Sequence, residues 1–265
     1  MTESLKYHQY TQEQLNAELI RLIDIHDYDG VKYILSSSDL LIHADIHTND
    51  DYCLIKVCSL GYLDFVKYLL TSTTLKEHAN INARGGQALI EAGKANRMEM
   101  IQYLLFSPEL SEHISIHSHD DAMLVELCEN GDPEYVEYAL TSPELKEHSN
   151  PFAQNSKCFK RALFFGHTDI VQYLLESPQL KQHIDPNCID NEDIFNIVKN
   201  ECNEVCFYLI DNFNLSINEQ LKKRITKSLK VKSYRKIFEK MKIRDFKNKL
   251  EMQLKEKENI CQQKI

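Results

Sequence analysis

The feature that most constrains the fold is a repeat with a period of 35 residues. Tyrosines recur at this step without an insertion, at Tyr33, Tyr68, Tyr103, Tyr138, Tyr173 and Tyr208, and histidines keep the same step at His43, His78, His113, His148 and His183. The surrounding sequence repeats too, as in YLLFSPELSEH at 103–113 and YLLESPQLKQH at 173–183. A period of about 20–50 residues is typical of chains that stack one small structural unit. We therefore expect a linear array rather than a single central core.

Each unit is predicted to be a pair of helices joined by a turn. Apolar residues recur at helical spacing in two short runs, for example Leu54 and Val57, then Phe65 and Leu69. Between the runs stand residue types that tolerate the left-handed conformation at a helix end, namely Gly61, Asn96, Gly131 and Gly166. An acidic residue lies three positions after this slot, in the first turn of the second helix. There its negative charge interacts favourably with the positive end of the helix dipole. These residues are Asp29, Asp64, Glu99, Glu134, Asp169 and Glu204.

The S-P-E-L segment after the second helix is predicted to add a helical turn to each unit. Ser107, Ser142 and Ser177 are suitable caps for a helix whose first residue is the following proline. Leucines in the middle of the segment are predicted to join the core: Leu40, Leu75, Leu110, Leu145 and Leu180. The histidine at its end is expected to bond a free helical carbonyl. Neighbouring units lie about 8–10 Å apart, too far for successive histidines to share a zinc ion.

Two segments carry a family resemblance. GHTDIVQYLL at 166–175 and GYLDFVKYLL at 61–70 resemble the G-H-x-x-I-V-x-x-L-L helix of the ankyrin-repeat family. The resemblance covers about residues 12–210 and implies an all-α, ankyrin-like repeat solenoid of about six helix-turn-helix units with a C-terminal helical extension. The chain would be a divergent member, because the usual period is about 33 and the usual T-P-L-H-x-A opening is absent. Tyr52-Cys53-Leu54-Ile55 stands in that slot.

The array is predicted to occupy residues 1–213, with units near 12–45, 46–80, 81–115, 116–150, 151–185 and 186–213. Thr11 and Gln14 form a capping-box pattern that predicts the first helix of the first unit. Residues 214–265 are predicted to be a basic amphipathic helical tail, because their apolar residues are spaced for one or two helices.

The net charge of −9 divides unevenly at this boundary. The tail holds 16 Lys/Arg against 6 Asp/Glu, a net +10, and the first 213 residues hold 15 against 34, a net −19. Three interpretations of the tail stay open: intramolecular docking on the acidic array, binding of nucleic acid or an anionic membrane, and a solvated helix face. Docking is favoured because the two charges are complementary.

The sequence predicts neither a cofactor nor a catalytic residue. It lacks the Gly-rich phosphate loops, G-x-S-x-G, H-E-x-x-H and the kinase motifs, so we expect a protein that is not an enzyme. The only local cluster of potential metal ligands is His117 and His119 beside Asp120 and Asp121. Asp50 and Asp51 occupy the same slot two units earlier. This recurrence favours a role in helix capping over metal binding, so no metal is expected.

A cytoplasmic location is expected where the protein is made. No apolar stretch has the length of a membrane span, and residues 1–10 lack the pattern of a signal peptide. The eight cysteines contain no C-x-x-C pair and are predicted to be reduced thiols. Ankyrin-like chains are often used by intracellular bacteria and large viruses to engage host proteins, so the resemblance leaves delivery into a host cell open.

The resemblance further implies a non-enzymatic module that binds a partner protein through its finger-loop tips and the concave face of its first helices. The residues predicted to contact the partner are Asp50, Asp51, Tyr52, Lys56, Arg84, Gln87, Glu91, His119, Asp120, Glu126, Gln154, Asn155, Lys157 and Arg161. Charge changes sign along one first-helix slot, from Lys56 through Glu91 and Glu126 to Arg161, which suits one specific partner. The alternative is an adaptor whose basic tail binds nucleic acid or an anionic membrane.

Overall fold

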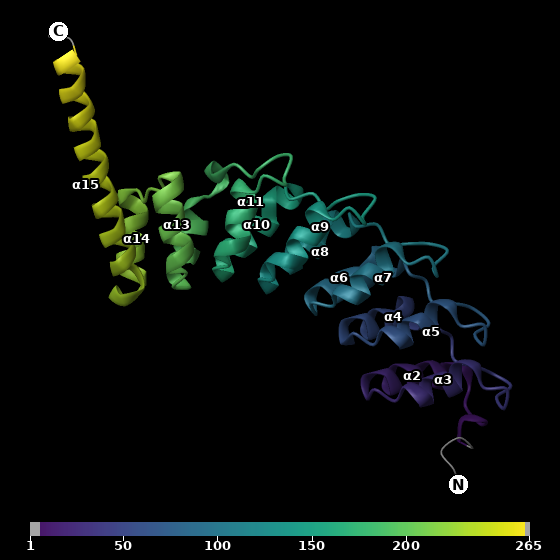
Figure 1. The fold of residues 1–265 in the computed structure, drawn as a ribbon. Helices are drawn as coiled ribbons and strands as arrows, with labels where there is room; N and C mark the ends of the chain where they lie inside the picture. The colour runs from purple at the N-terminus through teal and green to yellow at the C-terminus, as the bar shows by residue number, and fades with distance from the viewer. Residues whose placement is uncertain (1–5, 263–265) are drawn as a thin grey trace. The chain divides into compact units, whose positions relative to one another are not determined.

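A computed structural model describes residues 6–262, with side chains placed up to residue 255 (Figure 1). Residues 1–5 of the segment searched for a signal peptide, residues 263–265 of the predicted tail and the side chain of Cys261 lie outside the described part. The chain divides into two compact units. The first runs up to Asn130 and continues with Glu134–Gln154; the second comprises Gly131–Pro133 and the chain from Asn155 onward.

The first unit is a stack of helix pairs. The pairs are α2 (Gln12–Asp24) with α3 (Tyr28–Ser36), α4 (Thr48–Leu60) with α5 (Leu63–Thr71), α6 (Ala83–Lys94) with α7 (Met98–Phe106), and α8 (Ser118–Asn130) with α9 (Pro133–Thr141). The first helices of successive pairs pack against each other, α2 on α4, α4 on α6 and α6 on α8. Equivalent residues fill the core between them: Leu19, Leu54, Leu89 and Leu124 are all fully buried. The predicted all-α repeat solenoid is confirmed.

The turn inside each pair has the predicted left-handed residue. In the first unit His26, Gly61 and Asn96 have φ values of 61°, 79° and 54°. In the second unit Gly131, Gly166 and Glu201 have φ values of 84°, 82° and 61°. The acidic ladder lies in the first turn of the second helices, as predicted from the helix dipole: Asp29, Asp64, Glu99, Glu134, Asp169 and Glu204.

The S-P-E-L segment forms a β-turn, so the prediction of an added helical turn was wrong. The N–H of Leu110 donates to the carbonyl of Ser107 at 3.1 Å, and the Ser107 hydroxyl accepts from the N–H of Glu109 at 3.3 Å. Proline suits the second position of such a turn because its φ is fixed. Of the predicted core leucines, Leu40, Leu75 and Leu145 are buried, whereas Leu110 and Leu180 are half-buried.

The histidine ladder holds this turn to the helix before it, which confirms the predicted bond to a carbonyl. In every case Nε2 donates to the carbonyl of the serine that follows the second helix. The distances are 2.9 Å for His43–Ser37, 3.0 Å for His78–Ser72, 2.8 Å for His113–Ser107, 2.9 Å for His148–Ser142 and 2.8 Å for His183–Ser177. The serine carbonyl is shared, because it also accepts the N–H that closes the β-turn.

The second unit contains the remaining helices: α10 (Ala153–Phe165), α11 (Thr168–Glu176), a 3-10 turn (Pro186–Cys188), α12 (Asn191–Lys199), α13 (Asn203–Phe213), α14 (Glu219–Ser228) and α15 (Val231–Gln262). Both tail helices pack on the last pair, with α14 on α12 and α15 on α12 and α13. Leu221, Ile225 and Ile237 are the buried apolar residues of this contact. None of the described helices is long and apolar enough to cross a membrane.

Opposite charges accompany this apolar contact. Arg224 binds Glu192 through two hydrogen bonds of 2.6 and 3.1 Å, and this pairing holds the pKa of the Glu192 carboxyl below its usual value. The Arg224 guanidinium also lies 3.9 Å from the centre of the Phe195 ring. Lys240 lies 2.6 Å from Asp211 of α13. Basic residues of the tail thus pair with acidic residues of the last two helices of the array.

Candidate partner-binding surface

The finger loops contain a recurrent left-handed turn. Three consecutive residues have φ between 47° and 86° in each, at Asn49–Asp51, Arg84–Gly86, His119–Asp121 and Gln154–Ser156. We call these four segments the finger turns. Left-handed backbone costs about 1–2 kcal/mol for a residue other than glycine, so other contacts must hold the turns in place. The prediction that Asp50–Asp51 and Asp120–Asp121 cap a helix was wrong, because their own backbone is left-handed.

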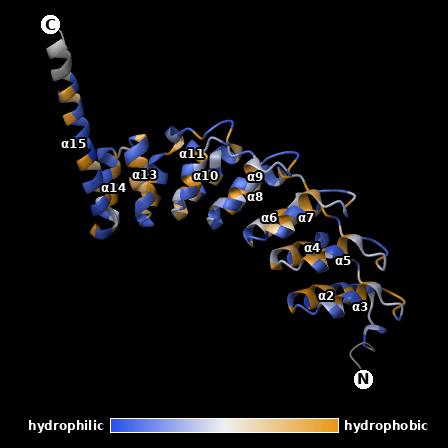
Figure 2. Cartoon of the chain, in the orientation of Figure 1, coloured by the Kyte–Doolittle hydropathy of each residue, from blue (hydrophilic) through white to orange (hydrophobic). Residues whose placement is uncertain are grey.

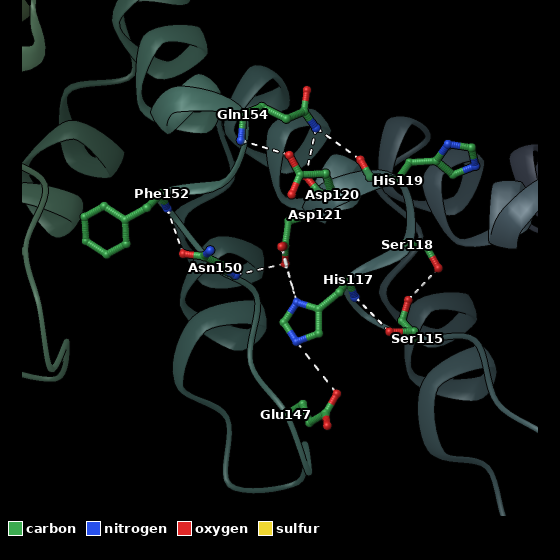
Figure 3. Close-up of polar contacts among 10 residues, drawn as sticks. All are labelled: Ser115, His117, Ser118, His119, Asp120, Asp121, Glu147, Asn150, Phe152 and Gln154. Carbon is green, nitrogen blue, oxygen red and sulfur yellow. Dashed lines mark hydrogen bonds and ion pairs between the residues drawn. The ribbon is translucent and has the colours of Figure 1, made fainter.

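Side chains link each finger turn to the one before it. The side chain of the first residue donates to the carbonyl of the residue 35 positions earlier: Arg84 Nη2 to Asn49, His119 Nε2 to Arg84 at 2.7 Å, and Gln154 Nε2 to His119 at 3.1 Å. Figure 3 shows Gln154 reaching over Asp120 to this carbonyl. The backbone N–H of Gln154 also donates to Oδ2 of Asp120 at 3.1 Å. Three of the predicted contact residues therefore hold the surface together.

Two buried carboxylates join the finger turns to the following unit. Asp51 and Asp121 are only 4% and 3% exposed. Oδ1 of Asp51 accepts from the N–H of Asn80 at 2.8 Å, and Oδ1 of Asp121 accepts from the N–H of Asn150 at 2.9 Å (Figure 3). Asp51 was predicted to contact a partner, but the structure places it inside, where it ties together two units.

A histidine completes each of these carboxylate sites. His47 Nδ1 lies 3.0 Å from Asp51, and its Nε2 lies 3.5 Å from the exposed Glu77. In the same way His117 lies 3.0 Å from Asp121 and 3.7 Å from Glu147. Each imidazole therefore bridges a buried and an exposed carboxylate.

Sequence reasoning missed these bridges, although the sequence carries a signal for them. Their members recur at a step of 70 residues, as the pairs His47 and His117, Asp51 and Asp121, Glu77 and Glu147, and Asn80 and Asn150. The unit between them has Asn82 and Gly86 in the slots of the histidine and the buried aspartate. The same bridge therefore occurs twice, two units apart, a match that a search at 35 alone does not show.

The H-x-H cluster is divided between different partners. His117 faces Asp121 and Glu147, whereas His119 donates to the carbonyl of Arg84 (Figure 3). Within the part of the chain that the structure describes, no group of three or more His, Cys, Asp or Glu side chains is placed to hold a metal ion.

The predicted first-helix residues form a second row next to the finger turns. Tyr52 and Lys56 on α4, Gln87 and Glu91 on α6, and Glu126 on α8 are half-buried. The Tyr52 hydroxyl donates to Asp24 at 2.7 Å, and this bond raises the pKa of Tyr52 to about 12. Glu91 accepts from Gln87 at 2.7 Å and from Lys94 at 2.9 Å. Much of this row is thus held in fixed orientations by neighbouring side chains.

An open groove of about 540 Å³ lies between the first two finger turns, and Asp50, Asp51, Asn80 and Arg84 are among its lining residues. The Asp50 side chain is 83% exposed and lies 4.0 Å from Arg84 Nε. Such a groove offers both an anionic and a cationic group to polar side chains of a ligand. It holds no pairing of a nucleophile with a base.

The other predicted residues belong to the second compact unit. Asn155 and Lys157 are exposed near the start of α10, and Arg161 is half-buried one turn further along that helix. The structure thus brings together the predicted residues from Asp50 to Gln154 within the first unit, and these three within the second.

Comparison with known proteins places the repeats in a family. Residues 21–120 match the family model of ankyrin repeats, in three copies. No curated protein and no solved structure gives a significant match. Ankyrin repeats generally mediate protein–protein interaction and are typically non-enzymatic. Residues 21–120 are therefore ankyrin repeats, and this match together with the stacked helix pairs supports an ankyrin-repeat protein.

Proposed function

We propose that this protein binds a folded partner protein through its finger turns and first helices, without catalysing a reaction. The ladder from Arg84, His119 and Gln154 to preceding carbonyls supports this most directly. It holds a costly left-handed backbone in one conformation at the exposed edge of the stack. A surface that is ordered before binding loses less conformational entropy when its partner arrives.

The proposed contact residues are those that remain accessible. Asp50, Asp120, Asn155 and Lys157 are exposed at the finger turns and the start of α10. Tyr52, Lys56, Gln87, Glu91, Glu126 and Arg161 are half-buried on the first helices. Arg84, His119 and Gln154 have a double role, as surface residues and as links between turns. We leave Asp51 out of the contact set because it is buried.

The charges of these residues suggest how a partner is selected. Along the first helices of the first unit, the same slot holds Lys56, then Glu91, then Glu126. A partner with acidic and basic groups in the complementary order would be favoured. Proteins that place like charges against these residues would be repelled.

Affinity purification with the intact chain from the cells that make or receive it tests the proposal. The double variant Asp50→Lys with Lys56→Glu should lose a protein that the wild type retains. Glu109→Lys is the matched control, because Glu109 is also exposed but lies in an S-P-E-L turn. A partner that survives the double variant as well as the control would contradict the proposed surface. The identity of the partner decides between a host protein and one from the same cell.

We also propose that the basic tail caps the end of the array. The buried Ile237 and the pairs Arg224–Glu192 and Lys240–Asp211 support this role. Ending the chain after Asn212 should expose the apolar residues beneath α14 and α15, lowering the melting temperature and the solubility. A truncated chain that is as soluble and as stable as the wild type would show that the tail is not a cap.

The competing function is an adaptor that uses the basic tail to bind nucleic acid. Salt titration of the captured complex distinguishes the two. Affinity for phosphates falls steeply with rising salt, because the counterions released on binding gain less entropy in a more concentrated salt solution, whereas a packed protein interface depends on salt more weakly.

A further inference from the structure

The distal half of α15 carries an apolar stripe that the cap does not use. Ile243, Phe246, Leu250 and Leu254 are 56%, 64%, 43% and 58% exposed. Figure 2 shows apolar residues continuing along α15 past its contact with the rest of the second unit. At about 100° per residue, the stripe lies roughly 180–260° around the helix from the buried Ile237. It therefore faces away from α12 and α13.

Lysines border the stripe on both sides. On the same helical projection, Lys242 and Lys249 lie along one edge and Lys247 lies along the other, and all three are exposed. The two acidic residues of the segment, Asp245 and Glu251, lie beyond these borders. Residues 242–255 hold five Lys/Arg against two Asp/Glu, a net +3. The stripe is thus an apolar face with a cationic rim.

The spacing of the stripe does not match the heptad of a left-handed coiled coil. Its members are three, four and four residues apart, or roughly 3.7 residues per turn, close to the 3.6 of a straight helix. A left-handed coiled coil needs about 3.5. Pairing with a second copy would also bring two segments of charge +3 together. Nucleic acid would use the lysines but leaves the apolar side chains without a role.

We propose that residues 242–255 of α15 bind an anionic membrane surface. The helix lies parallel to the surface, with the apolar face that includes Phe246 and Leu250 inserted among the headgroups. Lys242, Lys247 and Lys249 extend their alkyl chains along this face and place their ammonium groups at the lipid phosphates. This site is independent of the protein-binding surface of the first unit.

Cosedimentation of the full-length protein with vesicles tests the proposal. The wild type should bind vesicles of phosphatidylcholine with phosphatidylserine and not vesicles of phosphatidylcholine alone. Phe246→Ser with Leu250→Ser should weaken binding by about tenfold or more, since two apolar side chains no longer insert. Replacing Lys242, Lys247 and Lys249 by Gln should weaken it and reduce its dependence on salt.

Met252→Ser is the matched control. Met252 is 64% exposed, as is Phe246, but it lies about 120° from Phe246 around the helix. This variant should bind as the wild type does, and circular dichroism should show the same helix content in all variants.

Three results would overturn the proposal. The wild type would fail to bind anionic vesicles, or the Phe246/Leu250 variant would bind them as tightly as the wild type. Alternatively, sedimentation would show self-association that the Phe246/Leu250 variant abolishes while vesicle binding persists, which would make a second copy the occupant of the stripe.

Discussion

The buried carboxylate of Asp51 accepts a hydrogen bond at 2.8 Å from the backbone N–H of Asn80, 29 residues further along the chain. The same oxygen lies 3.0 Å from His47 Nδ1. One side chain thus holds a neighbouring imidazole and the backbone that leads into the next unit.

Replacing this carboxylate should weaken the stack. Asp51→Ala leaves a backbone N–H and an imidazole without their acceptor, and we expect a loss of about 1–3 kcal/mol in the free energy of unfolding. Asp51→Asn keeps an oxygen acceptor and should lose less. Asp50→Ala is the control, since the neighbouring exposed side chain should contribute within about 0.5 kcal/mol. Urea unfolding followed by circular dichroism measures all three, and equal midpoints for Asp51→Ala and Asp50→Ala would contradict the assignment.

In the second finger turn, Gly86 should tolerate a side chain less well than its neighbour Gly85. A Cβ at Gly86 would lie 2.5 Å from Ser118 Oγ and 2.7 Å from Ile114 Cγ2, at a φ of +86°. A Cβ at Gly85 would meet only the end of the His119 side chain, at 3.1 Å. We expect Gly86→Ala to destabilise the protein by about 2–3 kcal/mol and Gly85→Ala by about 1 kcal/mol. Thermal unfolding of the two single variants checks the order, and a larger effect at Gly85 would refute it.

The N-terminal unit should lose stability in acid through Glu18. Arg21 donates two hydrogen bonds to this carboxylate and Lys6 a third, and the bonds from Arg21 are the main reason that its pKa falls to about 2. A carboxyl whose pKa is lowered on folding adds stability above its unfolded pKa of about 4.5, and that contribution disappears as the pH falls towards about 2. Glu18→Gln should therefore melt lower than the wild type at neutral pH, and the difference should shrink with acidification.

The control for this variant lies on the same helix. Glu13→Gln changes an exposed carboxyl at the start of α2 and should leave the acid sensitivity of melting close to that of the wild type. If the melting temperatures of the wild type and the Glu18→Gln variant differed by the same amount at neutral pH and near pH 3, Glu18 would not be the source of the acid sensitivity.

Two isoleucines of α15 should lose very different amounts of stability on the same substitution. Ile237 is fully buried against the last helix pair, whereas Ile243 is 56% exposed. We expect Ile237→Ala to cost about 2–4 kcal/mol in the free energy of unfolding and Ile243→Ala less than about 0.5 kcal/mol. Guanidinium unfolding of both variants decides, and similar costs would mean that α15 does not pack on α12 and α13 as described.

The helix pairs were predictable because their signals are local. Apolar spacing, the left-handed slot at Gly61 and Gly166, and the acidic first turn each depend on residues within one or two helical turns. The histidine bond was predictable for the same reason, since His113 and its serine lie six residues apart.

The S-P-E-L turn was predicted wrongly because Ser-Pro suits both a helix start and a β-turn. A non-local bond favours the turn. In each unit the chain comes back to the second helix, as where the N–H of Ile114 donates to the carbonyl of Leu104 at 3.2 Å. A further helical turn would carry the chain past that carbonyl.

The finger turns could not be predicted from the sequence, because they also depend on non-local bonds. Local preferences disfavour three left-handed residues in a row such as His119, Asp120 and Asp121. What holds them is a carbonyl 35 residues earlier and, for Asp121, a backbone N–H 29 residues later. These partners become neighbours only once the units have stacked.

The ladder between finger turns also bears on how such a chain can change in evolution. Its acceptors are backbone carbonyls, at Asn49, Arg84 and His119, and every residue type supplies one. The donors accordingly differ, as arginine, histidine and glutamine, without a compensating change in the preceding unit. At this ladder, a duplicated or exchanged unit needs only a donor side chain of sufficient reach. This ladder therefore does not itself restrict the gain or loss of units by recombination.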